Sequence, residues 1–261
     1  MPVVGRLRSM GRNAAVTAAM LAALPSLAAA GPVPADWPRV TTEHFVVVHP
    51  PAYGADAAVI GGFAEEAWTL YRQVLGADPP AGVLIYLYDR ERFPREPSTA
   101  WAEHDPPSLH MLAPSAQPPR ERSWQDRLWY RKNVAHEFGH VALHTVAPRA
   151  GRMALFLFQE GIPEYLSVYR MGPQVRAKYA GYEESLRSRA RAGRLAFLHF
   201  EDDYGLAAQF IWFLEETFGA GASIRVWRSA APSWSQAIRE ELGVDVLELE
   251  ARWVRWAASR R

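Results

Sequence analysis

The pattern of apolar and polar positions predicts strands and a helix in residues 31–115. Residues 45–48 (FVVV) and 83–88 (VLIYLY) are apolar runs typical of strands, the second of a central strand. A shorter run at 109–113, bounded by prolines, predicts an edge strand. Between the first two runs, apolar residues recur at helical spacing before a glycine and two prolines: Ile60, Phe63, Ala67, Leu70 or Tyr71, and Val74.

From residue 123 onward the pattern is helical. Ser123 and Asp126 resemble a capping pair, and the helix that they begin can run to about Val146. Apolar residues spaced by three or four predict three further helices: about 162–171, about 205–218, and one that begins near Asp245.

Composition limits the chemistry that this α+β chain can carry. It has 261 residues, which suits one large domain or two small ones, and its composition, 49% hydrophobic and 22% charged, is enough for a buried core. The absence of cysteine excludes disulfides, cysteine-ligated zinc and a thiol nucleophile. A net charge of +1 argues against nucleic acid as the main partner. Any metal site must therefore consist of His, Asp and Glu.

Residues 1–30 have the order of a secretory signal peptide. Three arginines precede the apolar, uncharged stretch 13–24, and small residues follow at 28–30. A membrane anchor or a mitochondrial-type presequence is the alternative. We expect export to the periplasm or secretion, with no membrane span in the mature chain 31–261. Because residues 1–30 hold three basic and no acidic residues, the mature net charge is −2, which weakens the case for nucleic acid further.

One motif predicts a metal site: residues 136–140 read H-E-F-G-H within the helix that begins near Ser123. Positions i and i+4 of a helix share one face, so His136 and His140 can reach one Zn²⁺. Glu137 projects beside the metal, where its carboxylate can accept a proton from water. The alternative is a pair of core or surface histidines on a helix.

Catalytic zinc keeps three protein ligands, so a third is needed. Leu143 and Val146 stand where metzincins have Gly and His, which excludes that class. Glu160 lies 20 positions after His140 and is the candidate. Two His and one Glu form the thermolysin-type set, so we expect one Zn²⁺ per chain.

H-E-x-x-H followed about twenty residues later by E-G-x-x-E-Y resembles the gluzincin metallopeptidases, especially the small exported "peptidase MA-like" domains of bacteria. The resemblance implies a zincin-like fold. A small mixed sheet with helices would occupy the N-terminal part, 31–146, which ends in the H-E-x-x-H helix. Residues 147–261 would be mainly helical, and the cleft would run across that helix.

The resemblance also implies a role for each matched residue. By this resemblance Glu137 is the general base, and the zinc ligands are His136, His140 and Glu160. Glu164 would accept a hydrogen bond from the far nitrogen of a ligand histidine. Many relatives have a helix former where this chain has Pro163. Because proline is tolerated only in a first helical turn, Glu160 must lie just before that helix or in its first turn.

A donor opposite the metal would stabilise the tetrahedral intermediate. Tyr204 matches the family's tyrosine at a helix start, and His199 is the rival. Ordinary packing or capping is the alternative for both residues, and an exposed carboxylate is the alternative for Glu164.

Two functions follow from this sequence. The first is a zinc-dependent peptidase acting on a peptide or protein, which could add as an extra strand to the run at 109–113. The second is a non-catalytic zincin-like domain for binding or envelope assembly.

Overall fold

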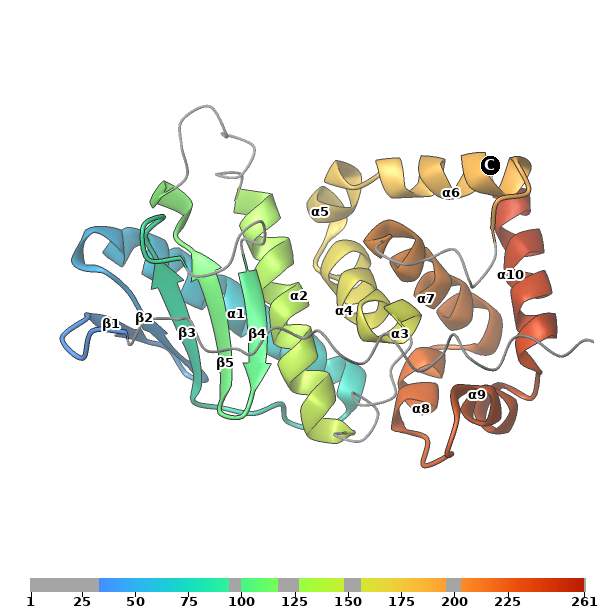
Figure 1. Ribbon diagram of the computed structural model, residues 1–261, viewed down its shortest axis with the longest axis horizontal. Coiled ribbons are helices and arrows are strands. Elements are labelled where there is room, and N and C mark those ends of the chain that lie inside the picture. The colour runs from blue at the N-terminus through green and yellow to red at the C-terminus, as the bar shows by residue number, and fades with distance from the viewer. Residues whose placement is uncertain (1–32, 94–99, 117–126, 148–155, 196–202, 261) are drawn as a thin grey trace, which may run out of the picture.

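The protein has an α+β fold, in agreement with the sequence (Figure 1). A five-stranded mixed sheet with helices forms the N-terminal part, and the C-terminal part is mainly helical. The computed structural model describes residues 33–93, 100–116, 127–147, 156–195 and 203–260. The signal peptide at 1–30, the capping pair at Ser123 and Asp126, and His199 lie outside these residues.

The strand order of the sheet is β1-β2-β3-β5-β4. The three inner strands are parallel, and the two outer strands pair antiparallel with their neighbours. β3 lies at the centre, as its continuous apolar run predicts. The strands are β1 (Arg39–Thr41), β2 (Phe45–Val48), β3 (Val83–Tyr88), β4 (Ala100–His104) and β5 (Pro107–Leu112).

The prediction of an edge strand at 109–113 is wrong. That run lies in β5, which pairs with β3 on one side and with β4 on the other. The edge strand next to it is β4, which the pattern did not predict. Its sequence, AWAEH, contains no β-branched residue, so pairing with β5 and packing decide its conformation more than propensity does.

Two helices, α1 (Gly54–Leu75) and α2 (Arg127–Val146), pack against the sheet. Alternate side chains of β3 are fully buried in the main core with these helices: Val83, Ile85 and Leu87. Tyr88 belongs to a second, aromatic cluster with Trp101 and Phe93. In Figure 1, α2 lies between the sheet and the C-terminal helices.

The C-terminal part contains the three helices expected there and others that the pattern did not predict. The helix expected over 162–171 consists of α4 (Gly161–Tyr165) and a π-helical segment (Leu166–Arg170). α7 (Tyr204–Phe218) and α10 (Val246–Ser259) match the other two. The unpredicted helices are α3 (Phe156–Gln159), α5 (Pro173–Lys178), α6 (Gly181–Arg191), α8 (Ala222–Arg228) and α9 (Trp234–Leu242).

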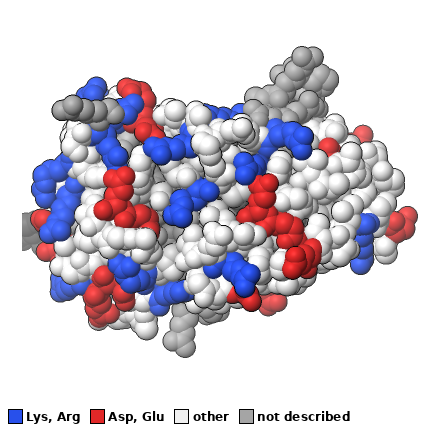
Figure 2. All heavy atoms as spheres, turned by 180° about the vertical axis from the view of Figure 1, so that it is seen from behind, with Lys and Arg blue, Asp and Glu red and all other residues white. Residues whose placement is uncertain are grey.

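The charges of this nearly neutral chain are mixed on the face that Figure 2 shows, where basic and acidic side chains lie among uncharged ones. None of the helices in the described ranges is long and apolar enough to cross a membrane.

Candidate metal centre

The two histidines of the motif lie on one face of α2, because residues four apart in a helix are neighbours. His136 is buried and His140 is half-buried. Their Nε2 atoms point at the same space and lie 3.2 Å apart. The rings meet nearly edge to face, with centroids 4.9 Å apart. Two ligand atoms therefore converge on one point beside α2.

Glu160 reaches the same point from the C-terminal part. It directly precedes α4, in which Pro163 is the third residue, so the proline lies in the first helical turn as expected. Two backbone hydrogen bonds link α3 to α4 across Glu160: its N–H bonds to the carbonyl of Phe156, and the N–H of Glu164 bonds to the carbonyl of Glu160, both at 2.9 Å. Oε2 of Glu160 lies 3.2 Å from Nε2 of His136 and 3.3 Å from Nε2 of His140.

These three atoms form a nearly equilateral triangle that fits a metal ion. Zn²⁺ takes such ligands at about 2.0–2.1 Å, and in a tetrahedron this bond length places neighbouring ligand atoms about 3.3 Å apart. The observed separations are 3.2, 3.2 and 3.3 Å. His136, His140 and Glu160 are therefore a group that could hold a metal ion, with two nitrogens and one oxygen as donors.

The electrostatics of the group favour positive charge. Burial and the Lys132 ammonium act to lower the pKa of His136, but contacts with Glu160 and Glu164 outweigh them and raise it to about 9. Burial acts to raise the pKa of Glu160, yet His136 and His140 hold it well below its ordinary value. A cation at this point, whether a proton or a metal ion, is thus stabilised by the carboxylates around it.

Glu164 lies on the Nδ1 side of His136 and is fully buried. Its Oε2 atom lies 2.7 Å from Nδ1 of His136 and 2.5 Å from Nζ of Lys132. Its Oε1 atom accepts a hydrogen bond from the Tyr182 hydroxyl at 2.9 Å. Burial acts to raise the pKa of Glu164, but Lys132 and His136 lower it to about 2, so the buried carboxylate is charged at neutral pH.

Sequence reasoning missed two of these residues. Lys132 lies four positions before His136, so helical spacing places it on the same face of α2, and only one other lysine exists in the chain. That spacing is a signal in the sequence from which a position of Lys132 near the metal ligands could be predicted. Tyr182 comes from α6 and carries no comparable signal in the sequence, because only folding brings α6 beside α4.

The two residues predicted to act on the substrate both lie near the ligands. Glu137 follows His136 on α2 and is half-buried. It is close enough to the buried Tyr71 that, after burial itself and Glu164, it contributes to raising the pKa of that phenol. Tyr204 is the first residue of α7 and 43% exposed, with its ring centroid 5.7 Å from that of His136.

A second pair of histidines lies at the end of the same helix. His104, at the end of β4, stacks on His144 of α2 with ring centroids 4.4 Å apart and planes 11° apart. Burial, His144 and His140 lower the pKa of His104 to about 4. Since two nearly parallel rings cannot both direct a nitrogen at one ion between them, this pair is a stacking contact between β4 and α2.

Comparison with protein-family models and with curated protein sequences gives no match for this chain.

Proposed function

We propose that this protein is a zinc-dependent peptidase. The observation that supports this most strongly is the triangle of His136, His140 and Glu160 ligand atoms, with Glu137 adjacent to His136 on the same helix. Two imidazoles and one carboxylate suit Zn²⁺ and leave a fourth position open for the reaction.

The chain would supply the base and the donor that peptide hydrolysis needs. Bound zinc would provide a Lewis acid that polarises the peptide carbonyl and lowers the pKa of water. Glu137 would accept the proton of the attacking water and deliver it to the leaving amine. The Tyr204 hydroxyl would donate a hydrogen bond to the oxygen that becomes negatively charged.

The substrate would add to β4 rather than to β5. β4 is an edge strand of the sheet and packs against α2, the helix of the metal ligands. An extended peptide that extends the sheet at β4 would therefore run close to His136 and His140. This role replaces the one expected for 109–113.

We also propose that the protein acts after export, in the periplasm or outside a bacterial cell. The support is the basic, apolar and small-residue order of residues 1–30. Cell fractionation, with sequencing of the N-terminus of the exported form, tests this; full-length protein confined to the cytoplasm would contradict it.

The peptidase proposal is tested by comparing the purified protein with its Glu137→Gln variant. We expect about one zinc per chain in both. The wild type should hydrolyse an unfolded protein, and the variant should lose about 10²-fold or more of that rate, because the base is gone while the ligands remain. Bound metal is measured by atomic emission and hydrolysis by mass spectrometry of the fragments.

Other outcomes separate the alternatives. If the purified wild type contains no zinc, the proposed metal centre is refuted. Zinc without hydrolysis of a broad peptide library would favour a non-catalytic zincin-like domain for binding or envelope assembly. Glu160→Ala should weaken zinc binding markedly, and an unchanged affinity would show that Glu160 is not the third ligand.

A further inference from the structure

Lys132 is buried although nothing in the proposed reaction uses it. Only 8% of its surface is exposed, whereas Lys178, the other lysine, is exposed on α5. A lysine is rarely buried unless it is paired, and here its Nζ atom lies 2.5 Å from Oε2 of Glu164. Because Lys132 and His136 are one turn apart on α2, both reach the same carboxylate oxygen from one rigid helix.

Tyr182 holds the other oxygen of Glu164. Its hydroxyl donates to Oε1 at 2.9 Å, and its ring packs against Gly205 at the start of α7. A Cβ atom at Gly205 would lie 2.8 Å from that ring, so the chain leaves room for the tyrosine only because residue 205 is a glycine. The position of the hydroxyl is therefore fixed by α6 and α7.

These contacts determine the orientation of His136. Lys132 holds one oxygen of the Glu164 carboxylate as an ion pair and Tyr182 holds the other, and Oε2 lies 2.7 Å from Nδ1 of His136. A histidine that is held at Nδ1 keeps its Nε2 lone pair aimed at a metal.

The same contact also acts on Glu160. Glu160 and Glu164 are one helical turn apart, and the N–H of Glu164 bonds to the carbonyl of Glu160 at 2.9 Å. The Lys132–Glu164 ion pair therefore ties the segment that carries one proposed ligand to the helix that carries the other two.

We propose that Lys132 and Tyr182 are positioning residues of the metal centre. They hold the two oxygens of Glu164, which contacts His136 through its carboxylate and Glu160 through its backbone N–H. This inference rests on the metal centre proposed above and is independent of peptidase activity.

The test is zinc affinity, measured on the metal-stripped, full-length protein by competition with a chromophoric chelator. Lys132→Met and Tyr182→Phe should each weaken zinc binding about tenfold or more, since loss of the partner of a metal-bound histidine has effects of this size and both residues hold that partner, Glu164. Lys132→Arg keeps the cation, and we expect it to recover most of the affinity. The visible absorption of the Co²⁺-loaded protein should change in Lys132→Met and Tyr182→Phe, because those bands report ligand geometry and not stability.

Two matched variants control for the loss of a lysine and of a tyrosine hydroxyl. Lys178→Met removes the exposed lysine, and Tyr165→Phe removes the hydroxyl of a buried tyrosine, which interacts with Arg170. Both should bind zinc and Co²⁺ as the wild type does.

Tyr182→Phe removes one hydroxyl and keeps the packed ring. It therefore tests the positioning role even if Lys132→Met does not fold. Wild-type zinc affinity and an unchanged Co²⁺ spectrum in the folded variants would overturn the positioning role of Lys132 and Tyr182 but leave the metal centre standing. A wild type that binds no zinc would overturn the metal centre as well.

Discussion

Gly139, inside the H-E-F-G-H motif, shows how closely the helices around the ligands approach one another. A Cβ atom at this position would lie 2.1 Å from the hydroxyl oxygen of Tyr71 on α1 and 3.0 Å from Cβ of Pro163 on α4. Tyr71 is fully buried and its ring packs against Phe138, so it has little room to move. The glycine therefore lets α1 and α4 contact α2 at the level of the ligands.

At this scale we predict that Gly139→Ala destabilises the protein although alanine favours helices. The added methyl group must displace the Tyr71 phenol, and overpacking of this kind costs about 1–3 kcal/mol. Gly62→Ala on α1 is the control, because nothing lies within 4 Å of its added Cβ and the change should stabilise by about 0.5–1 kcal/mol. Urea unfolding measures both; equal effects of the two substitutions would contradict the packing argument.

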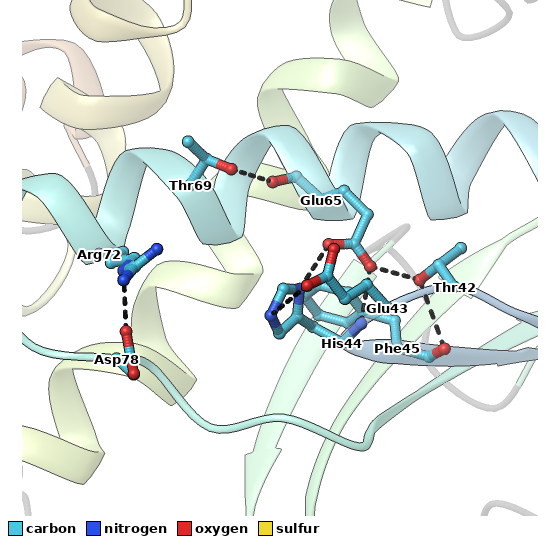
Figure 3. A network of polar contacts seen from close by, with 8 residues as sticks. All are labelled: Thr42, Glu43, His44, Phe45, Glu65, Thr69, Arg72 and Asp78. Atoms are coloured by element: carbon cyan, nitrogen blue, oxygen red, sulfur yellow. Dashed lines mark hydrogen bonds and ion pairs between the residues drawn. The ribbon is translucent and has the colours of Figure 1, made fainter.

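At the scale of elements, a polar network fastens the turn between β1 and β2 to α1 (Figure 3). Glu65 of α1 accepts hydrogen bonds from the backbone N–H of His44 at 2.8 Å and from the Thr42 hydroxyl at 2.5 Å, and its other oxygen lies 2.7 Å from Nδ1 of His44. The His44 ring also stacks on Trp68 at 3.6 Å between centroids. These contacts position β2, and with it the sheet, against α1.

This network predicts a loss of stability in acid. Burial acts to raise the pKa of Glu65, but hydrogen bonds from His44 and Thr42 outweigh it and lower the pKa below its ordinary value of 4.5. The carboxylate therefore stabilises the fold above the unfolded-state pKa, and this contribution is lost as the pH falls through the lower, folded-state pKa.

Glu65→Gln measures this contribution. The variant should be less stable than the wild type by about 1 kcal/mol at pH 6, since the carboxylate is partly exposed, and the difference should shrink as the pH falls below about 4.5. Urea titrations from pH 6 to pH 3 provide the values. A difference that stays constant over that range would show that the charge of Glu65 is not what matters.

At the scale of the whole molecule, the candidate metal centre joins the two parts of the chain. α2 closes the sheet part and carries His136 and His140, whereas Glu160 and Glu164 come from the helical part. In the unfolded chain these groups are not held together, so a metal ion would bind only the folded protein.

We therefore predict that zinc raises the free energy of unfolding. At a free zinc concentration 100 times the dissociation constant, the increase should be about 2.7 kcal/mol. Glu137→Gln should show the same increase because its ligands are intact, and His140→Ala should show little. Thermal unfolding with buffered zinc gives the comparison. A rise of equal size in His140→Ala would place the zinc elsewhere.

The sequence by itself determined the elements that have strong local signals. The β-branched and continuous apolar runs predicted β2 and β3, and helical spacing placed His136 and His140 on one face of α2. Pro163 limited Glu160 to the start of its helix. These features depend on neighbours along the chain, which a periodic pattern records.

Tertiary structure decided what depends on partners far apart in the sequence. It made β4 the edge strand in place of the run at 109–113, because sheet order follows from pairing between strands and not from the composition of one. It brought Glu160 to within 3.3 Å of both histidines. It also buried Lys132 against Glu164 and placed the Tyr182 hydroxyl at the other oxygen. A buried carboxylate must be paired, and only the packing of α4 beside α2 and the reach of Tyr182 from α6 supply the partners.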